Sequence, residues 1–237
     1  MAIDRTVPDD ASGQTAHEDF LLEVAEVIDG CRTSHRAMLD TVGGLDEEGV
    51  RAPCRLQGWT VGHVLTHLAR NADSHNRMLT AALTGEAVEQ YAGGRQERAD
   101  AIEAGAGRPA SELRDDVARS TAALEATWAA MTPDAWGGHG LSRGRPWPCR
   151  TLPYFRWREV EIHRVDLGLG YEVADWPDEY VRRELPLLLA TVPDRLADAD
   201  ERRRLLAWLT GRAPSSGDLD LARWESRPGH YFGSTRG

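Results

Sequence analysis

The chain contains no lysine, so all 28 of its basic residues are arginine, and 38 acidic residues outnumber them. The resulting net charge of −10 argues against a nucleic-acid-binding protein, because clustered cations must meet the phosphate backbone. It also disfavours anionic membrane surfaces. No run of eighteen apolar residues is present, so no membrane span is predicted. The N-terminal segment lacks the apolar stretch and basic leader of a secretory signal, and we expect a cytoplasmic protein.

Cysteine is scarce, with three residues that form no CxxC pair: Cys31, Cys54 and Cys149. An odd number at such spacings does not indicate a disulfide framework, and we interpret the three as small buried hydrophobic residues. Tryptophan is abundant, with eight residues. For most tryptophans a place in the core is predicted, with pocket lining as the alternative; they include Trp128, Trp136, Trp147 and Trp157.

The length of 237 residues suffices for one main domain with a small appendage. Apolar residues recur at helical spacing between glycine- and proline-rich stretches, and strand signal is close to absent. Thr60 and Ser111 are predicted to cap two helices. We therefore expect an all-α fold, a four-helix bundle with a cofactor site between facing helices. Helices are predicted over residues 17–42, 60–83, 111–131, 152–168, 178–189 and 194–209, with loops over 84–110 and 133–148 and an irregular tail.

The fourth predicted helix carries ionisable residues where its buried face is expected. At about 100° per residue, Glu159, His163 and Asp166 fall inside or at the edge of the apolar stripe, whereas Glu161 and Arg164 point towards solvent. A buried carboxylate needs a cation or a hydrogen-bonding partner. The apolar stripe itself consists of Phe155, Ile162, Val165 and Leu169.

Glu159 and His163 are four residues apart, so their side chains lie one above the other and are close enough to ligate one ion. The alternative is an ordinary carboxylate–histidine pair without a metal. A metal site requires a third ligand from another helix. The second predicted helix offers His63 on its polar side, His67 at the flank of its apolar face, and His75 within that face. Helix geometry narrows the third ligand to His67 or His75 without choosing between them.

Two segments resemble the mycothiol-dependent maleylpyruvate isomerases, which belong to the wider DinB-like superfamily of metal-binding four-helix bundles. They are GWTVGHVLTHLARNA, residues 58–72, and WREVEIHRVDLG, residues 157–168. The resemblance implies that His67, Glu159 and His163 are the metal ligands. It covers a bundle over residues 16–172, which leaves a flexible N-terminal arm at 1–15 and a small C-terminal region at 173–237.

The C-terminal segment LLAWLTGR, residues 205–212, resembles a motif that ends the second domain of this family. The resemblance implies that Arg212 is an arginine needed for activity. About thirty residues separate Tyr180 from Arg212, too few for the strands that family members place before the motif. We therefore expect a short, trimmed C-terminal helical extension in place of an α/β domain.

Three protein ligands leave a coordination position open on a divalent ion, and zinc is the expected metal. The resemblance implies that this position favours the thiolate of mycothiol, which adds to maleylpyruvate and leaves again to give fumarylpyruvate. Arg212 would hold a substrate carboxylate, and Asp166 would either orient a ligand ring or form an ion pair. The alternatives are a mycothiol S-transferase and a non-catalytic metal-binding DinB-like protein. Zinc, nickel and iron all suit such ligands, and the protein would be a monomer or a homodimer.

Overall fold

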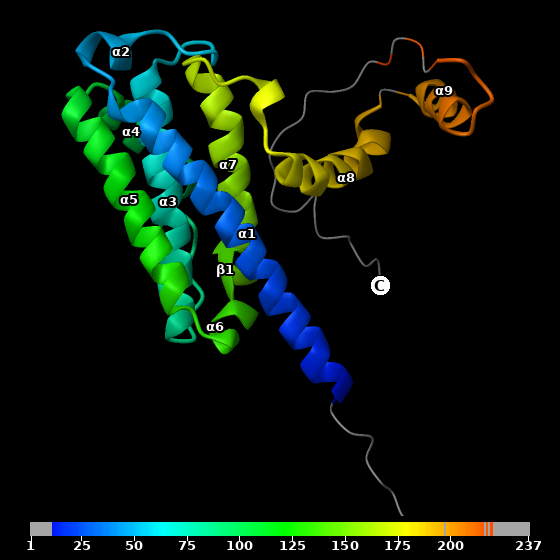
Figure 1. The fold of residues 1–237 in the computed structure, drawn as a ribbon, viewed down its shortest axis with the longest axis horizontal. Helices are drawn as coiled ribbons and strands as arrows, with labels where there is room; N and C mark the ends of the chain where they lie inside the picture. The colour runs from blue at the N-terminus through cyan, green and yellow to red at the C-terminus, as the bar shows by residue number, and fades with distance from the viewer. Residues whose placement is uncertain (1–10, 197, 216, 218, 220–237) are drawn as a thin grey trace, which may run out of the picture. The chain divides into compact units, whose positions relative to one another are not determined.

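The computed structural model describes residues 11–196, 198–215, 217 and 219 (Figure 1). The chain divides into two compact units, residues 1–176 and 177–237, and each is described by itself. The predicted boundary after residue 172 lies four residues before this division. Within the described part of the chain, no helix is long and apolar enough to cross a membrane.

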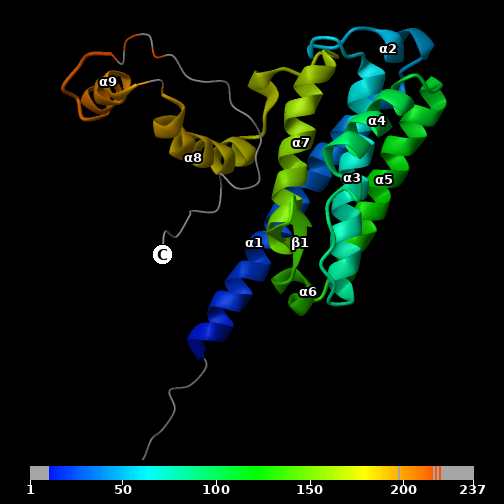
Figure 2. The ribbon, with the colours of Figure 1, turned by 180° about the vertical axis from the view of Figure 1, so that it is seen from behind.

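Four long helices form the first unit: α1 (Ala11–Gly43), α3 (Val61–Leu83), α5 (Ala110–Ala130) and α7 (Leu152–Leu167). Helix α3 packs against α5 and α7 (Figures 1 and 2). Helix α1 also packs against α5 and α7. The predicted all-α bundle is confirmed. Helix α1 begins at Ala11, inside the segment predicted as a flexible arm, and residues 1–10 of that arm lie outside the described part.

The core of the bundle is built around α3. Val64, Leu65 and Leu68 of this helix have no exposed surface, and they meet Leu113 of α5 and Val160 of α7 in one cluster. Each such side chain stabilises the fold by about 1.5–3 kcal/mol relative to an exposed one. The predicted core role of the tryptophans is confirmed by the burial of Trp128, Trp136, Trp147 and Trp157.

Helix α4 (Gly94–Ala106) packs against α3 where the sequence predicted only a loop. Only three of its residues are buried, Ile102, Gly105 and Ala106, so it has little apolar periodicity to reveal it. Gly62 explains how close the two helices come, because a Cβ on this residue would lie 2.4 Å from the carbonyl oxygen of Ala106. Gly62 therefore sets the position of α4 beside α3.

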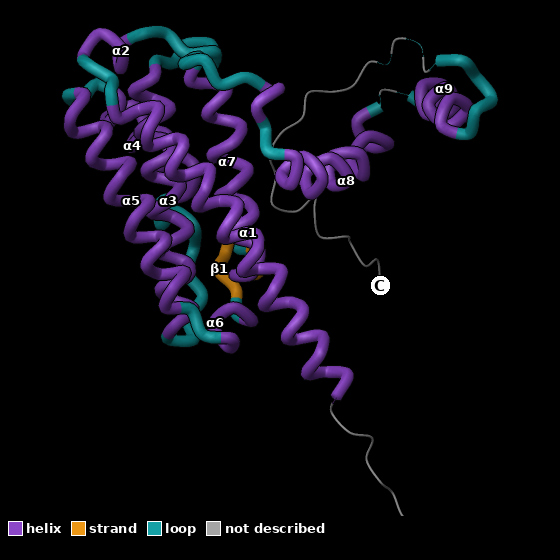
Figure 3. Tube along the Cα trace, in the orientation of Figure 1, coloured by secondary structure: helices purple, strands orange, loops and turns teal. Residues whose placement is uncertain are grey.

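The segment predicted as a loop after α5 contains a short helix and a hairpin: α6 (Pro133–Gly137), β1 (His139–Ser142) and β2 (Arg145–Pro148). The strands are antiparallel and are drawn in orange in Figure 3. Arg143 and Gly144 both have positive φ, 55° and 72°, as a type I′ hairpin turn requires. Each strand is only four residues long, and two prolines lie in β2, so the strand pattern in the sequence is weak.

The two predicted helix caps had different outcomes. Thr60 precedes α3 as its N-cap, which confirms the prediction. Ser111 is not a cap, because α5 begins one residue earlier, after Pro109. The first free backbone N–H, at Ala110, instead donates to the carboxylate of Glu47 at 2.6 Å. Glu47 belongs to the short helix α2 (Glu47–Arg51), so a residue distant in sequence caps α5.

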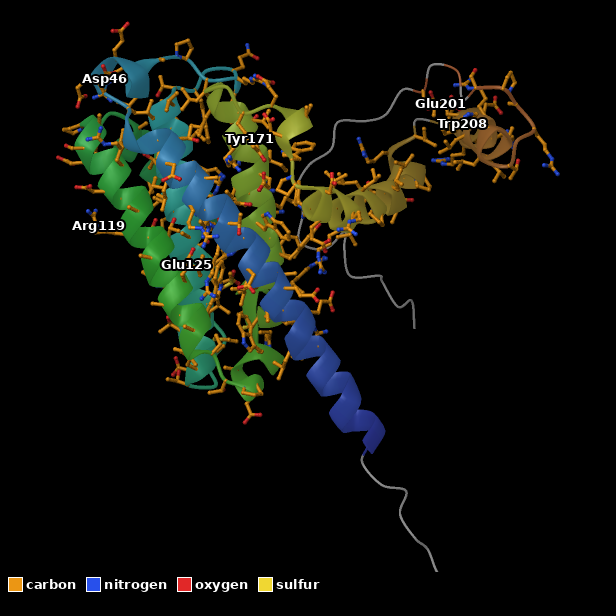
Figure 4. The ribbon with its side chains drawn as sticks, viewed as in Figure 1. Asp46, Arg119, Glu125, Tyr171, Glu201 and Trp208 are labelled. Atoms are coloured by element: carbon orange, nitrogen blue, oxygen red, sulfur yellow. The ribbon has the colours of Figure 1, made fainter. Side chains whose placement is uncertain are left out.

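The prediction that Glu161 points to solvent is wrong. Its side chain is fully buried, and it accepts hydrogen bonds from Ser34 of α1, from Trp157, and from Tyr171 at 2.5 Å. Arg164 is also largely covered, since its guanidinium lies over the Tyr171 ring, 3.6 Å from the centroid. Figure 4 shows Tyr171 just beyond the end of α7. Helix α7 is therefore covered on its polar side as well as on its apolar stripe.

Two 3-10 turns complete the first unit, η1 (Cys149–Thr151) and η2 (Val173–Asp175), and two helices form the second, α8 (Asp178–Arg195) and α9 (Ala199–Leu209). Helix α8 continues through two internal prolines to Arg195, beyond its predicted end at residue 189. Asp198 caps α9 through hydrogen bonds from Asp200 and Glu201. The described residues of the second unit contain no strand, as expected of a short helical extension.

Candidate metal centre

The structure brings His67 of α3 together with Glu159 and His163 of α7. The His67 Nε2 atom lies 2.9 Å from Glu159 Oε2 and 2.9 Å from His163 Nε2. The distance from His163 Nε2 to Glu159 Oε2 is 3.4 Å. Among the described residues, this is the one group of three histidine, cysteine or acidic side chains whose ligand atoms converge. We refer to it as the triad.

The dimensions of the triad fit a small divalent ion. Tetrahedral zinc with bonds of about 2.0–2.1 Å holds its ligand atoms about 3.4 Å apart. The Glu159–His163 distance already has this value, and the two contacts of His67 need to open by about 0.5 Å. Two imidazole nitrogens and one carboxylate oxygen are a donor set that zinc accepts.

The triad is covered from one side and open on the other. His67 is 3% exposed, whereas the side chains of Glu159 and His163 keep 21% and 17% of their surface. A ligand can therefore approach from the α7 side. Such an open position is typical of a catalytic metal site, whereas structural sites are closed by a fourth protein ligand.

The charges of the triad are strongly coupled. Burial and the neighbouring His163 lower the pKa of His67 to about 4. Burial acts on His163 in the same direction, but the carboxylates of Asp166 and Glu159 outweigh it and raise its pKa to about 9. Burial opposes ionisation of Glu159, and the two histidines outweigh it and hold its pKa well below the usual range. Glu159 thus stays ionised between the two rings, and His163 holds its proton more firmly than a free histidine does.

Two further side chains contact the outer nitrogens of the histidines. Asp166 Oδ2 lies 2.8 Å from His163 Nδ1, so the carboxylate orients this ring, one of the two roles predicted for it. Arg98 of α4 donates from its Nη2 to His67 Nδ1 at 3.0 Å. The Trp59 ring lies edge-on to His67, 6.1 Å between centroids. Arg98 was missed at the sequence level, because α4 itself was not predicted.

The structure separates the histidines that helix geometry left as alternatives. His75 is buried two turns beyond His67, with its ring edge-on to Trp147 at 5.7 Å, and it does not join the triad. His63 lies near the start of α3, where its Nδ1 accepts from the Thr60 backbone N–H at 3.1 Å. Of the three histidines of α3, His67 is the one whose ring nitrogen converges with Glu159 and His163.

Comparison with known proteins assigns the chain to a family. A family model described as the mycothiol maleylpyruvate isomerase N-terminal domain matches residues 31–168. The chain belongs to this family. The match includes all three residues of the triad, and it confirms the resemblance on which the choice of ligands depended.

Two solved structures agree with the family assignment. The crystal structure of the mycothiol-dependent maleylpyruvate isomerase matches this chain with a TM-score of 0.64 and 29% sequence identity. The match covers 67% of this chain and 66% of that chain. A variant of that enzyme with a histidine replaced by alanine has a TM-score of 0.63 and 28% identity over the same shares. The chain therefore covers just under two thirds of these structures. No curated protein matches the chain.

Arg212, the arginine predicted from the family's C-terminal motif, lies in the second unit just after α9. It is exposed, and its guanidinium donates to the carbonyl oxygen of Thr210. Its role remains a prediction. The family model ends at residue 168, before this unit begins.

The three cysteines lie apart from each other as free thiols. Cys31 and Cys149 are buried and Cys54 is partly buried, which agrees with their interpretation as small hydrophobic residues. Burial raises the pKa of Cys149 to about 11 and also raises the pKa of Cys54. Neither shift favours a thiolate, and none of the three sulfurs belongs to the triad.

Proposed function

We propose that this protein is a metal-dependent and thiol-dependent cis–trans isomerase, which converts maleylpyruvate to fumarylpyruvate with mycothiol as its thiol cofactor. The observation that carries the proposal is the triad, in which His67, Glu159 and His163 converge at an open site inside the bundle of this family. The named activity of the similar solved structure supports the choice of thiol and substrate.

The three side chains suit a divalent cation, with zinc as the expected ion. His67 would bind through Nε2 as a neutral ring, and Glu159 would supply the negative charge. Asp166 accepts from His163 Nδ1 and so turns His163 Nε2 towards the same point. The cation would supply positive charge that lowers the pKa of an incoming thiol and favours its thiolate.

The reaction needs no redox partner. The thiolate sulfur adds to one carbon of the cis double bond, and the electron pair moves towards the conjugated keto group. The resulting carbon–carbon single bond rotates. The carbon–sulfur bond then breaks, the trans double bond forms, and the thiol is recovered unchanged. The chain contributes by holding the thiol and the substrate beside the triad, where Glu159 and His163 keep part of their surface exposed.

A second candidate is a mycothiol S-transferase that keeps the carbon–sulfur bond instead of breaking it. The described part of the second unit favours this candidate, because it contains two helices and no strand, and it lies outside the match to the family model. The two reactions share the thiolate and differ in whether the adduct is released.

The test combines metal content with turnover in one preparation. We expect about one divalent ion per chain and isomerisation of maleylpyruvate only when mycothiol is added. A stable thiol adduct without isomerisation would favour the transferase. A protein that holds a metal but forms neither product would be a non-catalytic metal-binding member of the family.

Single-residue variants test whether metal binding and turnover depend on the triad itself. His67→Ala and Glu159→Gln are expected to lose bound metal and to lower turnover by at least about 100-fold, since each removes one of three ligands. His139→Ala is the matched control, because this histidine is exposed on β1, outside the triad. Full activity of His67→Ala in a metal-free preparation would overturn the proposal.

A further inference from the structure

A pocket of about 170 Å³ lies between α3 and α4, next to the triad. Arg70, Ser74 and Arg77 line it from α3, where they continue the face that carries His67 at helical spacing. Tyr91 lines it from the segment before α4, and Arg98 lines it from α4 itself. Arg98 therefore belongs to the pocket wall and also contacts the triad, since it donates to His67 Nδ1.

The walls of this pocket carry more positive charge than their own carboxylates neutralise. Arg70 is paired with Asp73 and with Asp116 at 2.8 Å each. Glu97 accepts a hydrogen bond from the backbone N–H of Gly93. Among the described residues, no carboxylate oxygen lies within ion-pair distance of Arg77 or Arg98, the other two guanidinium groups.

Tyr91 and Gln90 add uncharged donors to the two arginines. The Tyr91 side chain lines the pocket together with Ser74 and Arg98, and Gln90 donates to Ser74 Oγ at 3.3 Å. A guanidinium and a phenol that converge on one space match the planar, two-oxygen geometry of a carboxylate. The chemistry of the pocket therefore favours a carboxylate over a neutral ligand.

The contact between Arg98 and His67 connects the pocket with the triad. A guanidinium can only donate, so His67 Nδ1 accepts in this structure. A cation held by Nε2 leaves the ring proton on Nδ1, and this nitrogen can then no longer accept from Arg98. Loading of the triad thus breaks the contact and frees the guanidinium for a ligand in the pocket.

We propose that Arg98 binds a carboxylate of the substrate in this pocket, and that a cation at the triad is what releases Arg98 to do so. The inference rests on the proposed function, whose substrate carries carboxylates. It assigns recognition of one carboxylate to the bundle itself, whereas the family resemblance implies Arg212 of the second unit for that role. It also predicts that metal and carboxylate strengthen each other's binding, because such coupling is reciprocal.

The test uses maleate as an unreactive dicarboxylate probe, without any thiol, and measures binding by calorimetry. In the zinc-loaded full chain, Arg98→Gln is expected to weaken maleate binding by at least about tenfold, the effect of losing one hydrogen bond to a charged group. Arg95→Gln is the matched control, because Arg95 is an exposed residue of α4 outside the pocket lining. Removal of zinc from the wild type is expected to weaken maleate binding as well.

A second readout needs no carboxylate. Arg98→Gln removes a positive charge beside His67 and the hydrogen bond to His67 Nδ1 that zinc binding would break. Without maleate, the Arg98→Gln variant is therefore expected to bind zinc more tightly than the wild type and Arg95→Gln do. Equal maleate and zinc affinities in Arg98→Gln and the wild type would overturn the inference.

The inference can fail while the proposed function stands, namely if thiol-dependent isomerisation proceeds normally in Arg98→Gln. Conversely, loss of isomerisation in every preparation, with metal-coupled maleate binding intact, would overturn the proposed function and leave the carboxylate site in place.

Discussion

Zinc that binds at the triad must displace a proton from His163, and this requirement determines how the affinity depends on pH. Asp166 and Glu159 raise the pKa of His163 to about 9 against the effect of burial, so its ring is protonated at pH 7 in the metal-free protein. The Nε2 lone pair becomes available only when that proton leaves. His67, with a pKa of about 4, and Glu159, with its lowered pKa, have already lost theirs.

The magnitude follows from the distance between the working pH and the pKa of His163. Two units separate pH 7 from 9, so proton competition weakens zinc binding at pH 7 by about 100-fold, or about 2.7 kcal/mol. Affinity is therefore expected to rise about tenfold per pH unit from 7 to 9 and then to level off. Binding at pH 7 is expected to release about one proton per ion.

Competition with a chromophoric chelator between pH 6.5 and 9.5 measures the affinity, and calorimetry in two buffers counts the protons. Asp166→Asn is expected to flatten the pH dependence, because it removes the carboxylate that contacts His163 Nδ1. Asp115→Asn, at an exposed position of α5, serves as the control. An affinity that is constant from pH 7 to 9 in the wild type would show that zinc displaces no proton from His163.

Three further predictions concern stability. In the metal-free protein, the raised pKa of His163 stabilises the fold fully below pH 6.5, and this contribution of about 3 kcal/mol is lost as the pH rises through 9. Urea unfolding should thus show His163→Gln destabilised at pH 6 and close to wild type at pH 9.5; an equal difference at both pH values would contradict the assigned charge. Gly62→Ala is expected to cost about 1–3 kcal/mol, because its Cβ would meet the Ala106 carbonyl. Gly107→Ala, with open space around its Cβ, should change little, and a neutral Gly62→Ala would disprove the close approach of α4. Glu161→Gln is expected to cost about 2–3 kcal/mol in thermal or urea unfolding with metal content unchanged, since an amide turns a donor towards Ser34, Trp157 and Tyr171. Unchanged stability would show that Glu161 does not accept these bonds.

The bundle and the two α7 residues of the triad were predictable because their evidence is local. Helical periodicity identifies α7, and the spacing of Glu159 and His163 by four residues puts both on one face whatever the rest of the chain does. The third ligand depends on how α3 packs against α7. No property of α3 alone distinguishes His67 from His75, and it was the family resemblance that selected the residue the structure brings to the site.

The features that the sequence did not reveal are those decided by distant contacts. Glu161 is polar and lies opposite the apolar stripe of α7, yet Ser34 and Tyr171 cover it with hydrogen bonds from other parts of the chain. Helix α4 has few apolar residues and is held by its contact with α3. Because the sequence predicts a loop where α4 lies, it gives Arg98 no place beside His67.

The metal site and the thiol chemistry are tested together by measuring metal content and thiol-dependent isomerisation in one preparation each of the wild type and His67→Ala. We predict about one divalent ion per wild-type chain, turnover of maleylpyruvate only with mycothiol, and loss of both metal and turnover in His67→Ala. A wild-type protein that binds no divalent ion when zinc is supplied would contradict the assignment of the triad as a metal site, as would a His67→Ala variant with unchanged metal content.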